Sequence, residues 1–199
     1  MATGQSVVED RLLYVSVGRE FAPVAQTTGI NLGIGYEQMF SPLFGFGVEW
    51  QSFSGRLRNS FVQRNDLQGL NYSRIRGSLF LRAPWTPESR SHIGVGTGLA
   101  LTSGYLNPVR YEFTGVSYLR NESELSFSKM QFQVDLTLDF PLGERFVLGG
   151  ESQTGWMLGR DYPSRWRFFR IPDSQSITGN DRGRFRVSAL FRIFVGYRL

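Results

Sequence analysis

Hydrophobic and polar residues alternate with a period of two along most of the chain, the pattern of a β-strand whose two faces meet different surroundings. The alternation is clearest in residues 130–140, where the apolar register runs from Met130 to Phe140 and the polar register from Gln131 to Asp139. Similar segments occupy residues 11–19, 30–37, 44–51, 72–82, 93–101, 146–158 and 184–199. The pattern predicts eight strands of about 9–14 residues, longer than the typical strand of a soluble protein and long enough to cross a bilayer at a tilt.

The links between these predicted strands alternate in length. Three are short, at residues 38–43, 83–91 and 141–145, and four are longer, at about 20–28, 55–70, 102–128 and 159–182. With an even number of strands, this places all short links at one end, as in outer-membrane barrels with short periplasmic turns and long external loops. We therefore expect an all-β fold, an eight-stranded antiparallel up-and-down transmembrane β-barrel formed by residues 11–199 as one domain, preceded by a tail at residues 1–10.

Alternation alone does not say which face points outward, since a soluble barrel alternates too, with its apolar side chains inside. The interior of an eight-stranded barrel is just wide enough to be filled by side chains. In this chain the apolar register is bulky and the polar register is rich in glycine. The glycines are Gly33, Gly35, Gly45, Gly47, Gly94, Gly96 and Gly98. We expect the bulky apolar side chains outside, against lipid, and the soluble barrel remains the alternative.

Composition narrows the classes of chemistry. The chain has no cysteine and a single histidine, His92, which excludes disulfide scaffolds, thiol catalysis and metal sites built from several histidines. We expect no cofactor and no metal. Residues 1–10 have neither a basic nor an apolar stretch, so we expect a mature chain that lacks its signal peptide, located in the outer membrane.

The net charge is +5 and the pI is about 9.9, with Lys129 as the one lysine among 22 basic residues. A basic protein raises the question of nucleic acid. The arginines, however, are spread along the chain and interleaved with acidic residues, and no nucleic-acid-binding motif is present. Nucleic acid is therefore not an expected partner.

With these features, the chain resembles the small eight-stranded outer-membrane barrels of the outer membrane protein X type and of the outer membrane protein A transmembrane domain. The resemblance covers about residues 11–199 and includes the C-terminal segment from Phe191 to Leu199. This segment is similar to the signal read by the barrel-assembly machinery, with alternating apolar residues and an aromatic residue, Tyr197, third from the end. Leu199 stands where the family more often has phenylalanine.

Charged residues of both signs occupy the polar register, and we expect them to form an ionic network inside the barrel. They are Glu37, Glu49, Arg74, Arg76, Asp135, Asp139, Glu151, Arg184, Arg186 and Arg192. Mixed signs suit a buried network, because an unpaired buried charge is strongly destabilising. The network is predicted to plug the barrel, and a narrow conducting path is the alternative.

The long loops hold the candidate binding residues. Arginine and aromatic residues together form good contacts to phosphate and to protein partners. The candidates are Arg165, Trp166, Arg167, Phe168, Phe169 and Arg170 in the fourth long loop, with Arg56 and Arg58 in the second. His92 lies next to Ser91 and near Glu88, but it is predicted at the periplasmic end, and we expect an exposed turn residue rather than the base of a hydrolase.

We therefore expect a non-enzymatic scaffold whose external loops bind a surface ligand, lipopolysaccharide or a partner protein. The barrel is expected to be a monomer or a subunit of a larger envelope complex. A pore and a lipid-modifying enzyme are the alternatives.

Overall fold

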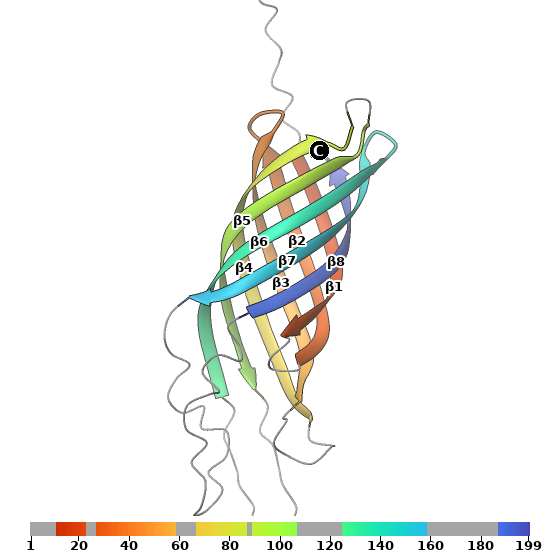
Figure 1. Cartoon of the computed structure of the whole chain (residues 1–199). Helices are drawn as coiled ribbons and strands as arrows, with labels where there is room; N and C mark the ends of the chain where they lie inside the picture. Colours follow the sequence, from red (N-terminus) through yellow and green to blue (C-terminus); the bar gives the residue numbers. More distant parts are fainter. Residues whose placement is uncertain (1–10, 23–26, 59–66, 87–88, 107–124, 159–186) are drawn as a thin grey trace, which may run out of the picture.

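The protein is an eight-stranded closed barrel, as seen in a computed structural model that describes residues 11–22, 27–58, 67–86, 89–106, 125–158 and 187–199 (Figure 1). Every strand pairs antiparallel with the next one in the chain, and β8 pairs with β1 to close the sheet. The strands are β1 (Arg11–Ala22), β2 (Thr27–Met39), β3 (Phe44–Arg58), β4 (Leu67–Pro84), β5 (His92–Leu106), β6 (Leu125–Leu142), β7 (Phe146–Leu158) and β8 (Val187–Arg198). The predicted fold class is confirmed.

No helix within the described ranges is long and apolar enough to cross a membrane.

The two ends of the barrel differ. The links β2–β3, β4–β5 and β6–β7 lie at the same end as the C-terminus, the upper end in Figure 1, which we call the short-turn end. The opposite end, where residues 59–66, 107–124 and 159–186 connect the strands, is the long-loop end. The prediction of a long link at residues 20–28 is wrong, because β1 runs to Ala22 and β2 begins at Thr27. Backbone pairing with β2 continues to Ala22, beyond the residues of β1 in which apolar and polar side chains alternate clearly.

Local sequence explains the short turns. Gly143 has a φ of 80°, a conformation that side chains rarely allow, and it opens the three-residue link between β6 and β7. In the β2–β3 link, the Ser41 hydroxyl accepts a hydrogen bond from the backbone N–H of Phe44 at 3.0 Å. These links are built from local contacts, which is why the residue types alone were enough to predict their positions in the sequence.

The offset of the strands is a property of the closed sheet. Following paired residues from Ser128 through β5, β4, β3, β2 and β1, and then through β8 and β7, leads back to β6 at Leu138. The path therefore returns ten residues further along the strand. An offset of this kind inclines the strands to the barrel axis, typically by about 35–45°. The ribbons in Figure 1 are slanted in this way.

The apolar register faces outward. Phe132, Phe191 and Ile193 are 38%, 56% and 61% exposed, although they are large hydrophobic side chains in the middle of strands. The polar residues that alternate with them, such as Gln131, Gln133 and Arg192, are almost completely buried. Side chains of this distribution suit a barrel surrounded by acyl chains and do not suit a soluble barrel, whose apolar side chains point to the axis.

Candidate functional site

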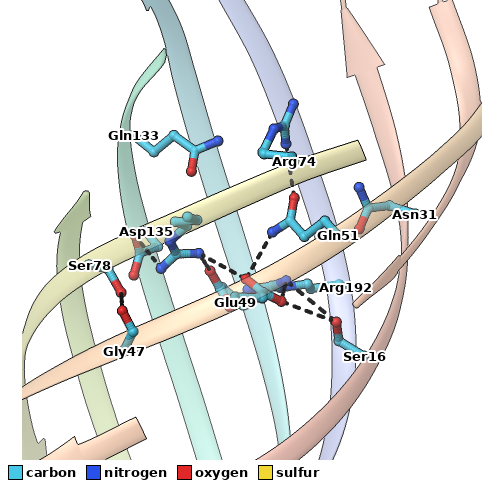
Figure 2. A network of polar contacts seen from close by, with 12 residues as sticks. Ser16, Asn31, Gly47, Glu49, Gln51, Arg74, Ser78, Gln133, Asp135 and Arg192 are labelled. Carbon is cyan, nitrogen blue, oxygen red and sulfur yellow. Dashed lines mark hydrogen bonds and ion pairs between the residues drawn. The ribbon is translucent and has the colours of Figure 1, made fainter. Parts of the chain in front are cut away.

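The centre of the barrel holds an ionic cluster in which two arginines share three carboxylates (Figure 2). Arg192, on β8, pairs with Glu49 of β3 and with Glu151 of β7. Arg76, on β4, lies 2.8 Å from Glu151 and 2.9 Å from Asp135 of β6, and it is 3.5 Å from Glu49. Because each arginine reaches across the lumen to other strands, the cluster ties opposite walls of the barrel together.

A second cluster lies closer to the long-loop end and centres on Arg74. Its guanidinium pairs with Glu20 at 2.9 Å and donates hydrogen bonds to Gln51 at 3.0 Å and Thr102 at 3.1 Å. The guanidinium carbon also lies 5.1 Å from the ring centroid of Tyr72. Arg74 is only 1% exposed, so its charge is compensated by these neighbours rather than by solvent.

A third cluster lies at the short-turn end. Arg82 pairs with Glu37 at 2.5 Å and with Asp139 at 3.3 Å, and Nδ1 of His92 lies 2.9 Å from the Asp139 carboxylate. The expectation of an exposed turn position for His92 is wrong, because this residue is the first of β5 and its side chain is 28% exposed. The strand pairing places it opposite Asp139, which draws the imidazole toward the lumen. No serine hydroxyl among the described residues bonds to this imidazole, so the described part of the chain contains no Ser–His–acid triad.

Apolar side chains also fill the lumen toward both of its ends. Toward the short-turn end, Leu12, Tyr14, Val147 and Phe194 pack together, with the rings of Tyr14 and Phe194 5.4 Å apart. Toward the long-loop end, the rings of Phe53 and Tyr72 stack at 4.5 Å.

Within the lumen, the side chain of Arg192 and the residues Gln51 and Gln133 have no exposed surface. The centre of the described interior is therefore filled by side chains rather than open to water.

Comparison with known proteins gives likeness in structure only. No protein-family model and no curated protein sequence matches the chain. Among solved structures, Neisserial surface protein A matches 96% of this chain over 97% of its own length, with a TM-score of 0.60 and 8% identity.

Two further solved structures are similar. The attachment invasion locus protein Ail of Yersinia pestis, in complex with the heparin analogue sucrose octasulfate, matches 96% of this chain over 99% of its own, with a TM-score of 0.54 and 8% identity. A major outer membrane protein of Thermus thermophilus matches 95% over 99%, with a TM-score of 0.52 and 14% identity. This chain has the fold of the small outer-membrane β-barrels.

The outer-membrane barrel fold brings together most of the residues expected inside. Glu37, Glu49, Arg74, Arg76, Asp135, Asp139, Glu151 and Arg192 all point into the lumen and take part in ion pairs. Arg184 and Arg186 lie outside the described residues, which resume at Val187.

Two charged members of the network, Glu20 and Arg82, were missed by the sequence reasoning. Both share the inward register of their strands, which was the available signal. Glu20, however, lies beyond the clear alternation of residues 11–19, and Arg82 is the last residue of the segment 72–82.

The predicted binding residues of the loops belong to a part that the structure does not describe. Arg165, Trp166, Arg167, Phe168, Phe169 and Arg170 lie outside the described residues. The placement of Arg56 and Arg58 in the second long loop is wrong, because β3 continues to Arg58 through its pairing with β4; their side chains are outside the described part.

Proposed function

We propose that the protein is a non-enzymatic scaffold of the outer membrane, with a closed barrel whose external loops bind an anionic surface ligand. The filled lumen carries this proposal. A barrel whose central side chains have no exposed surface offers no binding cavity or path through the centre of its described interior. Ligands are therefore bound by the external loops. The two classes of ligand for these loops are lipopolysaccharide and a protein partner of the envelope.

The charge of the loops supports an anionic ligand. Residues 159–186 contain seven arginines and three aspartates, and Arg165, Arg167 and Arg170 alternate with aromatic residues. Six carboxylates and four guanidiniums take part in the lumen ion pairs described above, so the rest of the chain is more basic than the net charge of +5 suggests. Arginine forms paired hydrogen bonds to phosphate and sulfate groups, of the kind that the heparin analogue bound to Ail carries.

The test is a charge-matched comparison of two triple variants of the full chain in detergent. Replacing Arg165, Arg167 and Arg170 by serine is expected to weaken binding of lipopolysaccharide and of sucrose octasulfate by about tenfold or more. The control replaces Arg11, Arg90 and Arg145, which are exposed at the short-turn end, by serine and should keep wild-type binding. Unchanged binding in the loop variant, or equal loss in both variants, would overturn the proposed loop site.

Two further measurements address the alternatives. A closed lumen predicts that the protein gives no single-channel conductance in planar bilayers, and steady channels would favour the pore. For the enzyme alternative, incubation with phospholipid and lipopolysaccharide should leave both intact, and turnover that is lost on His92→Ala would contradict the scaffold.

A further inference from the structure

Arg19 is a charged side chain placed on the lipid-facing side of the barrel. It is exposed and lies three residues before the long-loop end of β1, on the register of Val15 and Val17. Its paired neighbours are Ile30 of β2 and Phe191 of β8, which are 60% and 56% exposed. Arg19 therefore projects outward among apolar side chains that face acyl chains.

This placement is unusual within the described strands. Of the charged side chains described there, Arg19 and Arg11 lie on the outward register, and Arg11 is the first residue of β1, at the short-turn end. No carboxylate within the described ranges pairs with Arg19. A guanidinium against lipid is unfavourable unless it reaches the interface or meets an anion there.

The side chain of Arg19 is turned toward the long-loop end of the barrel. Its guanidinium carbon lies 5.3 Å from the ring centroid of Phe21, which is two residues closer to the long-loop end. The Phe21 ring in turn contacts Phe191 edge-on, with centroids 6.4 Å apart. A contact of this kind favours a side-chain direction toward the long-loop end, where the headgroups of the loop-side leaflet would lie.

Small residues lie beside this group. Ala189 of β8 pairs with both Phe21 and Thr154, and Ser152 of β7 pairs with Phe191. Ala189, Thr154 and Ser152 are half-buried and shorter than the large side chains around them. The outer surface of the barrel beside Arg19 and Phe21 is therefore lower than its surroundings. An acyl chain can lie along this part of the outer surface while the Arg19 guanidinium reaches the phosphate of the same lipid, closer to the long-loop end.

We infer that Arg19, Phe21 and Phe191 form a site for a phosphate-bearing lipid of the outer leaflet. The guanidinium binds the phosphate by charge-assisted hydrogen bonds, and the two rings contact the first part of an acyl chain. The ligand is the phosphate of a lipid and not free phosphate, because the site opens onto the apolar surface. This inference rests on the proposed insertion in the outer membrane and is independent of the loop arginines.

The experiment measures lipid retained on the intact barrel by native mass spectrometry, after incubation in detergent with bisphosphorylated lipid A or with its dephosphorylated form. Wild type is expected to retain the phosphorylated form, and Arg19→Gln to retain about tenfold less. Arg19→Lys should fall between them, because lysine keeps the charge but loses the paired hydrogen bonds. Arg145→Gln, an exposed arginine in the β6–β7 turn, is the control and should equal wild type.

Three outcomes would overturn the inference. One is retention by Arg19→Gln within about twofold of wild type, one is equal retention of dephosphorylated lipid A, and one is displacement of the lipid by millimolar inorganic phosphate. The migration of unheated samples on gels checks that each variant is folded. The loop proposal fails separately, when the Arg165, Arg167 and Arg170 variant keeps its binding of sucrose octasulfate.

Discussion

Single buried charges in this barrel depend on partners that lie far away in the sequence. Arg192 is 41 residues from Glu151 and 143 residues from Glu49, and it compensates both carboxylates. Ser16 lies beside the same guanidinium, within 3.4 Å. Removal of such a group leaves its partners charged and without solvent, which costs more than the ion pair itself contributes.

Arg192→Leu is therefore expected to lower the free energy of unfolding by about 3–5 kcal/mol, because it leaves Glu49 and Glu151 without this partner. Urea unfolding of the protein in lipid vesicles, followed by tryptophan fluorescence, measures the change. Arg145→Leu removes an exposed arginine and should cost less than about 1 kcal/mol. Adding Glu151→Gln to Arg192→Leu should restore part of the loss, and a double variant that is less stable still would contradict the network.

At the scale of the strands, glycine on the inward register makes room for large side chains from the neighbouring strand. A Cβ on Gly149 of β7 would meet the ring of Phe194 on β8, and a Cβ on Gly35 of β2 would meet the ring of Tyr14 on β1. Both rings belong to the apolar cluster toward the short-turn end. Small and large residues thus alternate between adjacent strands, and the filling of the lumen depends on that complementarity.

Gly149→Ala should destabilise the barrel by about 1–3 kcal/mol, since the Phe194 ring has to move out of its packed position. The matched control is Gly77→Ala on β4, where an added Cβ meets nothing within 4 Å, and its effect should be below about 0.5 kcal/mol. Both are measured by the same unfolding assay. In a Phe194→Leu background the cost of Gly149→Ala should shrink, and a cost that stays the same would place the strain elsewhere.

At the scale of the whole molecule, the barrel has a packed polar interior and an apolar outer surface. A soluble barrel has the opposite arrangement, with apolar side chains inside. Trp50 and Trp156 are 46% and 40% exposed on the outward register, whereas Trp85 lies in the link between β4 and β5. The outward tryptophans lie on the wall that faces acyl chains, and the link lies at the end of the barrel. The depth of each tryptophan therefore reports how the barrel sits in a bilayer.

Three single-tryptophan variants, with the other tryptophans replaced by phenylalanine, test this arrangement. Lipids brominated in the middle of the acyl chain should quench Trp50 and Trp156 by several-fold more than Trp85, because bromine quenches on contact. Fluorescence in vesicles with and without brominated lipid gives the ratio. Equal quenching at all three positions, or none, would show that the barrel does not span the bilayer in this orientation.

Much of the fold could be predicted from the sequence, because side chains on a strand point alternately to two faces and the two faces here meet different surroundings. Residues 130–140 show this most clearly, and all their apolar members from Met130 to Phe140 lie on the outward side. The inward direction of Arg76 and Asp135 follows from the same alternation. The long link predicted at residues 20–28 shows the limit, since Arg19 breaks the apolar register while the backbone of β1 continues to Ala22.

The sequence by itself determined the number of strands, the short turns and the face of most strand residues, since these depend on local alternation and on turn residues such as Gly143. Only the tertiary structure decided which charges meet, because that depends on the ten-residue offset with which the sheet closes, a property of all eight strands together. For the same reason His92 faces Asp139, Glu20 reaches Arg74, and Arg19 lies between Ile30 and Phe191. Alternation fixes the direction of a side chain, whereas closure of the barrel fixes its partner.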